Sequence, residues 1–257
     1  MSLYTQNAVT LEQLTAIPVP EYTRSWRPVP YRDAIDYVKL AAQRQLGLPV
    51  ASESYGLSKD GQQMFGVITL DTGDNAQGLA LGVRGSYNKT LANGLVAGAQ
   101  LFVCDNLMFS GDAFKIVRKN TINVWADFRA LVSSHIQDAL GHYRNVIAQG
   151  EAMKAVPLPL ARGYAVLGVA LGEQVLTPTQ ANVAYGDWRE PRHPEFAERS
   201  LWGLYQAVTE GLKKGAPGRL ADRHTAAHGF FTGLAPRLGS GPRPLACLPL
   251  APAARDL

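Results

Sequence analysis

The chain has 257 residues, of which 46% are hydrophobic and 18% are charged. This length allows one large domain or two small ones, and the composition is typical of a folded globular protein. No run of about eighteen uninterrupted apolar residues occurs, and residues 1–11 lack the basic and apolar regions of a secretory signal. The two cysteines, Cys104 and Cys247, are too few for a disulfide framework or a cysteine-built metal site. We therefore expect a cytoplasmic protein that does not contact a membrane.

The net charge of +4 is unevenly distributed along the chain. Residues 1–210 carry 18 basic and 19 acidic side chains, whereas residues 211–257 carry 7 and 2. A basic C-terminal end favours a polyanionic partner, although the same charge would also serve only to keep the protein in solution.

Residues 1–25 are predicted as an N-terminal arm, since they show no clear period. A helix is predicted from Tyr31 to about Leu46, and Gly47 is a suitable residue to end it. Apolar residues recur along this helix at intervals of three and four: Ile35, Val38 and Ala42.

Two extended runs, residues 54–58 and 62–70, flank Asp60-Gly61. An Asp-Gly pair between extended runs predicts a β-hairpin. A third extended run is predicted over residues 78–84, after a polar loop.

Residues 101–104 are predicted as a buried strand, and the Ala- and Gly-rich piece before them as either a strand or a short helix. A long helix is predicted to begin near Asn120 or Thr121, either of which is a suitable cap. Its apolar stripe covers about seven turns at helical spacing: Trp125, Phe128, Val132, Ile136, Leu140, Tyr143 and Ile147.

The remainder of the chain is predicted to be helical up to a proline-rich tail. Helices are expected over about residues 160–171, after Thr177-Pro178, over 195–214 and over 219–231. From Ala235 the chain has five prolines in 23 residues, which predicts a flexible tail or a docked extended segment.

The order of strands followed by helices predicts an α+β fold, in which an antiparallel hairpin sheet packs with a long helix. We expect four parts: an arm (1–25), an α+β core (26–155), a helical subdomain (156–234) and the basic tail (235–257).

Common catalytic and cofactor motifs do not occur. Neither a phosphate-binding lysine loop, a dinucleotide fingerprint nor a Gly-x-Ser-x-Gly elbow is present. His224 and His228 are four residues apart, but Thr225 stands where a zinc protease has glutamate. His135 and His142 are seven apart on the long helix, where a polar helix face explains them better. We therefore predict no metal and no cofactor.

The most informative segment is the turn formed by residues 84–90, Arg-Gly-Ser-Tyr-Asn-Lys-Thr. It offers two cations, hydroxyl groups, an amide and an aromatic ring. Cations neutralise phosphates and aromatic rings stack on bases, so the turn suits a nucleic acid. A second cationic group precedes the long helix: Lys115, Arg118 and Lys119. A polar β-turn beside a solvated helix start is the simpler alternative.

Cys104 follows three apolar residues, so a buried structural role is expected in place of a reactive thiol. Asp105 and Asn106 after it suit a turn or a helix cap.

These residues also resemble a known family. The stretch Val83-Arg84-Gly85-Ser86, followed by residues 102–112 (Phe-Val-Cys-Asp-Asn-Leu-Met-Phe-Ser-Gly-Asp), is similar to the phage- and plasmid-associated family named domain of unknown function 932. Residues 201–213 and 224–231 are similar to its C-terminal part, so the resemblance covers roughly residues 25–232. Tyr87, Asn88 and the proline-rich tail depart from the family pattern.

The resemblance implies a role in replication, recombination or conflict with a host, because members are carried on prophages and mobile elements. The predicted hairpin sheet and long helix are also similar in layout to phage single-strand annealing proteins, although a fold alone does not establish a function.

Our leading hypothesis is a non-enzymatic, single-stranded DNA-binding protein of phage or plasmid origin that forms a homo-oligomer and acts in annealing or recombination. Arg84, Lys89, Lys115, Arg118 and Lys119 would bind phosphates, and Tyr87 would stack on a base. Two alternatives remain open. One is a small enzyme or anti-host factor that uses Ser86, Asp105 and Asn106, and the other is a structural or partner-binding protein.

Overall fold

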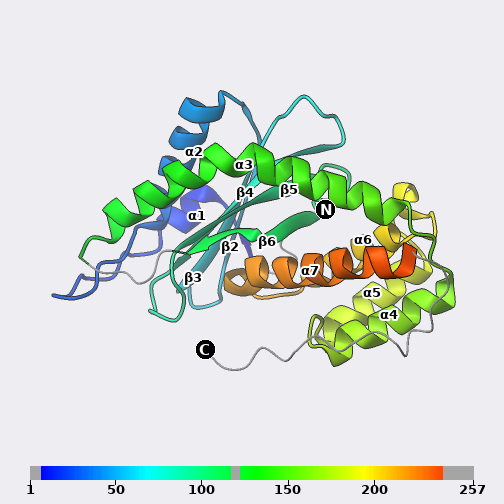
Figure 1. Ribbon diagram of the computed structural model, residues 1–257. Coiled ribbons are helices and arrows are strands. Elements are labelled where there is room, and N and C mark those ends of the chain that lie inside the picture. The colour runs from blue at the N-terminus through cyan, green and yellow to red at the C-terminus, as the bar shows by residue number, and fades with distance from the viewer. Residues whose placement is uncertain (1–6, 117–121, 240–257) are drawn as a thin grey trace. The chain divides into compact units, whose positions relative to one another are not determined.

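The computed structural model describes residues 7–116 and 122–239, with the backbone alone for 112–116 (Figure 1). The chain forms two compact units that alternate along the sequence. Unit 1 comprises residues 1–148 and 213–225, and unit 2 comprises residues 149–212 and 226–257. The predicted α+β class is confirmed: an antiparallel sheet is followed by a long helix and then by further helices.

Unit 1 is built on a six-stranded antiparallel sheet in which every strand pairs with its neighbours in the chain. The strands are β1 (Ala8–Val9), β2 (Val50–Leu57), β3 (Gln63–Leu70), β4 (Gln77–Ser86), β5 (Gly94–Leu101) and β6 (Leu107–Ile116). The predicted hairpin is confirmed, because β2 and β3 pair around Asp60-Gly61 and Gly61 has a φ of +70°. This left-handed conformation is one that glycine adopts without strain.

The Ala- and Gly-rich piece before residue 101 proves to be a strand, β5. Gly98 lies where β5 and β6 shift register, and a side chain there would overlap the Met108 carbonyl. The prediction of a buried strand over residues 101–104 is wrong. The strand ends at Leu101, and Phe102 and Val103 are exposed in the following turn. Their apolar side chains gave this turn the pattern of a strand.

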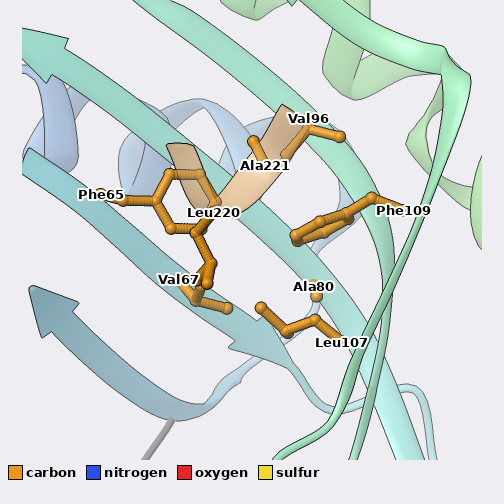
Figure 2. Close-up of a cluster of buried hydrophobic side chains, with 8 residues drawn as sticks. All are labelled: Phe65, Val67, Ala80, Val96, Leu107, Phe109, Leu220 and Ala221. Atoms are coloured by element: carbon orange, nitrogen blue, oxygen red, sulfur yellow. The ribbon is translucent and has the colours of Figure 1, made fainter. Parts of the chain in front are cut away.

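Both faces of the sheet are covered, which explains why β3, β4 and β5 are buried almost throughout. On one face the sheet packs against the start of α7 (Leu220–Gly239), and Figure 2 shows this cluster around Leu220. Phe65 and Phe109 meet edge to face there, with ring centroids 6.3 Å apart. The cluster consists of Phe65, Val67, Ala80, Val96, Leu107, Phe109, Leu220 and Ala221.

The opposite face carries α2 (Tyr31–Leu46), whose bounds are those predicted, with Gly47 left-handed at its end. Its predicted apolar residues, Ile35, Val38 and Ala42, are all buried. Tyr37 on α2 contacts Trp125 and Ser133 of the long helix α3 (Val124–Lys154), so these two helices are neighbours.

The apolar stripe of α3 is confirmed in its middle, where Phe128, Val132, Ile136 and Tyr143 are buried. The helix begins at Val124, and the predicted caps Asn120 and Thr121 lie outside the described residues. The polar face expected at His135 and His142 is wrong for His135, which is buried because it lies beside Ile136 on the stripe.

A short strand and helix were missed near the N-terminus: β1, followed by α1 (Leu11–Thr15). Thr10 and Gln13 cap α1 through reciprocal side-chain bonds, a short-range signal that apolar periodicity does not detect.

Unit 2 consists of helices: the end of α3, α4 (Leu160–Gly172), α5 (Pro178–Arg189), η1 (Pro194–Phe196), α6 (Leu201–Leu212) and most of α7. The predicted Thr177-Pro178 start is confirmed as a capping box. The helix predicted over 195–214 is interrupted, since residues 197–200 separate η1 from α6.

In unit 1, η2 (Pro217–Arg219) precedes α7, which begins at Leu220 and extends beyond the predicted 231 to Gly239. Residues 235–239 of the expected tail are therefore helical, and the rest of that tail lies outside the described residues.

In the parts of the chain that the structure describes, no helix is both long enough and apolar enough to cross a membrane.

Candidate functional site

The turn between β4 and β5 presents Lys89 at an exposed tip. Asn88 organises this turn, because its side-chain oxygen accepts a hydrogen bond from the Ser86 hydroxyl at 2.7 Å and from the Thr90 amide at 3.2 Å. Lys89 has a φ of +63°, a left-handed conformation that costs a lysine roughly 1 kcal/mol or more. Strained residues of this kind gather at functional sites, so the conformation draws attention to Lys89.

The Lys89 ammonium lies over the ring of Trp26, 4.8 Å from its centroid. Trp26 belongs to a tight turn in which Thr23 and Trp26 bond each other through both backbone amides. In the same segment the Arg27 guanidinium lies 5.5 Å from the ring centroid of Tyr22, whose side chain is 74% exposed. We name this set the Lys89 surface: Tyr22, Arg24, Trp26, Arg27 and Lys89. It alternates aromatic rings and cations, and all but half-buried Trp26 are exposed.

Tyr87 attaches the β4–β5 turn to the start of α2. Its ring stacks on Tyr31 with centroids 3.8 Å apart and planes 2° from parallel. Its hydroxyl oxygen accepts a hydrogen bond from the Tyr31 amide at 3.0 Å, which satisfies a free amide in the first turn of α2. Burial raises the pKa of both tyrosines. Tyr87 is only 4% exposed, so its ring offers no free face on which a base could stack.

Arg84 lies on the other face of the sheet and is also 4% exposed. Its guanidinium donates to both carboxylate oxygens of Asp222, at 3.1 and 2.9 Å, and to the Ala92 carbonyl at 3.2 Å. The guanidinium thus neutralises an acid within unit 1. Because Arg84 is buried and engaged by Asp222 and Ala92, its guanidinium is not exposed to a ligand in this arrangement.

The second cationic group is only partly described. Lys115 pairs with Leu95 near the end of β6, at the sheet end where the β4–β5 turn lies. Arg118 and Lys119 fall outside the described residues. Of the six predicted contact residues, Lys89 is therefore the one whose exposed side chain the structure describes.

The residues of the enzymatic alternative are not brought together. Ser86 ends β4 beside the start of β5, whereas Asp105 and Asn106 follow the far end of β5, about 23 Å along the strand. Ser86 and Asn106 are buried, and Asp105 accepts from Gln100 at 3.3 Å. Cys104 is buried as expected, and Lys213 donates to its backbone carbonyl.

The two histidines considered as metal ligands serve different structural contacts. His224 lies 2.9 Å from the Leu107 carbonyl of β6. The Nε2 of His228 donates to Gln149 at 2.7 Å, and its Nδ1 accepts from the Tyr205 hydroxyl at 3.1 Å. Burial lowers the pKa of His228 to about 4 and raises the pKa of Tyr205. Within residues 7–116 and 122–239 there is no group of three or more His, Cys, Asp and Glu side chains that could hold a metal ion.

Sequence reasoning missed Tyr22, Arg24, Trp26 and Arg27, since they were assigned to the N-terminal arm and its boundary. The signal that identifies them is the local alternation of aromatic and cationic residues in Tyr22-Thr23-Arg24-Ser25-Trp26-Arg27. No family model, curated protein or solved structure matches the chain.

Proposed function

We propose that the protein binds single-stranded nucleic acid through the Lys89 surface. The observation that supports this is the Lys89 ammonium over the ring of Trp26, together with a second cation–aromatic pair, Arg27 and Tyr22, in the same segment. Single-strand binding proteins combine cations that follow the backbone with rings on which successive bases stack. The three cations here, Arg24, Arg27 and Lys89, are exposed, and Glu21 is the one acidic residue between 21 and 30.

Preference for a single strand follows from the same chemistry. Rings such as Trp26 and Tyr22 contact the flat faces of bases, which a duplex keeps stacked on one another. The cations alone would bind either form. The rings therefore supply the discrimination, and the cations supply the salt dependence.

The biological role that we propose is strand annealing or recombination for a phage or plasmid. This part rests on the resemblance of residues 25–232 to the mobile-element family and on the sheet followed by a long helix. The proposal includes a homo-oligomer. In support, among the described residues β1 pairs with only two residues of β2, and no strand lies beside residues 50–54 at that sheet edge.

The test is fluorescence anisotropy with labelled single-stranded and duplex DNA at about 50 and about 200 mM salt. Three neutralised phosphates predict a slope of log K on log salt near −2 for the single strand, and removing one cation should lower it by about 0.7. Trp26→Ala should weaken single-strand binding by roughly 1–3 kcal/mol and leave duplex binding unchanged.

A matched control is Arg144→Ala. Arg144 is an exposed cation of α3 beside Tyr143, whose hydroxyl lies 3.2 Å from Thr72 in the loop between β3 and β4. That loop is at the opposite end of the sheet from Lys89. If Arg144→Ala and Lys89→Ala lose the same affinity for single-stranded DNA, the loss is an effect of net charge and not of the Lys89 surface. If the native chain does not bind at low salt, the proposal is excluded. Mass photometry of the same samples tests the oligomer.

A further inference from the structure

Unit 2 contains a groove between α4 and α5 that the single-strand proposal does not use. Its volume is about 580 Å³, within the range of small-molecule sites. Five residues line it: Tyr164 from α4, and Asn182, Tyr185, Gly186 and Arg189 from α5.

The residues from α5 are spaced as i, i+3, i+4 and i+7, so they form one face of the helix. The helix packs through its other face, where Ala181, Ala184 and Trp188 are buried and the Trp188 indole donates to the Leu160 carbonyl at 3.0 Å. Asn182 and Arg189 are exposed and Tyr185 is half-buried. The groove face is therefore not required for packing α5.

The chemistry of the groove changes along its length. The rings of Tyr164 and Tyr185 lie 5.7 Å apart with planes tilted by 42°, which leaves no room for a base between them. Both tyrosines are half-buried and line the groove, so a planar group would stack on the exposed part of a ring. Asn182 offers an amide with both donors and an acceptor. Arg189 stands seven residues further, about 10.5 Å along the helix, and supplies a cation. No lining residue carries a carboxylate.

We propose that this groove binds a nucleotide unit. The base stacks on the tyrosine pair with its edge at Asn182, and the phosphate binds the Arg189 guanidinium. The absence of acidic lining residues disfavours a cationic ligand, and the amide and guanidinium disfavour a purely apolar one. A free nucleotide and a nucleotide within a strand share this chemistry, and the experiment below distinguishes these sources.

The experiment is isothermal titration calorimetry of the full chain with adenosine, AMP and an oligo-dA strand. It is performed in a background in which the aromatic residues and cations of the Lys89 surface are all replaced by alanine (Tyr22, Arg24, Trp26, Arg27 and Lys89), so that its outcome is independent of that surface. Tyr185→Ala should lower the affinity for adenosine and for AMP by about tenfold, because both ligands lose the ring on which the base stacks. Arg189→Ala should lower the affinity for AMP but leave the affinity for adenosine unchanged. Arg237→Ala, which removes another exposed cation of unit 2, is the matched control and should change neither.

AMP binding with this pattern of losses supports the site and indicates a free nucleotide as the source. Binding of oligo-dA alone, lost in Tyr185→Ala and Arg189→Ala, supports the site and indicates a strand. The proposal is overturned if neither ligand binds, or if Arg237→Ala weakens AMP as much as Arg189→Ala does. Arg199 donates a hydrogen bond to the backbone carbonyl of Arg189 at 2.9 Å. Arg189→Ala keeps this carbonyl, so we expect the variant to fold normally.

Discussion

At the end of β4, Arg84 and Tyr87 are enclosed by neighbouring elements, whereas Asn88, Lys89 and Thr90 are exposed in the turn. All five lie within seven consecutive residues. The enclosed side chains hold this sheet end together: Arg84 binds Asp222 on one face, and Tyr87 stacks on Tyr31 on the other. The exposed lysine is then held over Trp26.

The difference shows that neighbouring residues whose chemistry would suit a ligand can differ completely in burial. Strand alternation places Arg84 and Tyr87 on opposite faces, but both faces are covered here, so neither reaches solvent. Lys89 is exposed because β4 ends three residues before it, at Ser86. Arg84 and Tyr87 therefore stabilise the base of the turn, and only its tip is exposed for the contact that we propose.

The largest effect that we expect is on folding, from Arg84→Ala. The substitution leaves Asp222 and the Ala92 carbonyl without their cation and opens a cavity. Since Asp222 is partly exposed, we expect a loss of about 3 kcal/mol in the free energy of unfolding, at the lower end for broken buried pairs. Urea denaturation followed by circular dichroism measures it, with Arg144→Ala as the control. A loss below about 1 kcal/mol would contradict the structural role.

The buried His228 should make the stability of the fold depend on pH. The folded pKa of His228 is about 4, below its ordinary value of 6.5, so the unfolded chain binds the proton more readily. Stability should therefore be full above about pH 6.5 and fall as the pH drops towards 4, by on the order of 3 kcal/mol. His228→Gln should flatten the slope of unfolding free energy over this window. An unchanged slope would show that other groups cause the acid sensitivity.

The sequence predicted those features that depend on neighbours in the chain. The apolar spacing of α2, the left-handed glycine at its end, the Asp60-Gly61 hairpin and the stripe of α3 all follow from local periodicity and turn chemistry. Each of these signals depends on residues only a few positions apart in the chain. They were sufficient to establish the α+β class.

The candidate site was less predictable because burial depends on distant partners. Arg84 meets Asp222 138 residues away, and Tyr87 meets Tyr31 56 residues away. The chain pattern before folding gives no indication of either partner. Trp26 was overlooked for the opposite reason. It lies in an irregular segment with no helical or strand pattern, and only its contact with Lys89 in the folded chain identifies it as part of the candidate site.

A smaller loss is expected from Tyr87→Phe. The ring stack on Tyr31 is kept, but the Tyr31 amide loses its acceptor at the start of α2, which should cost about 1 kcal/mol of unfolding free energy. Tyr22→Phe, which removes an exposed hydroxyl, is the control and should cost nothing measurable. If the two variants unfold at the same urea concentration, the Tyr87 hydroxyl does not cap α2.

The sharpest test of the comparison comes from Lys89→Gly beside Lys89→Ala. Glycine relieves the left-handed strain while alanine retains it, so the glycine variant should be more stable than the alanine variant by about 1 kcal/mol. Both variants lose the ammonium, and the cation–π contact that it makes with Trp26 contributes only about 0.5 kcal/mol at an exposed site. Both should weaken single-strand binding equally and reduce its salt slope by about 0.7. A glycine variant that folds at least as well as the native chain but binds DNA less well would show that the strained lysine is kept for its ligand. If instead binding follows stability across the two variants, Lys89 belongs with Arg84 and Tyr87 among the residues that maintain the fold.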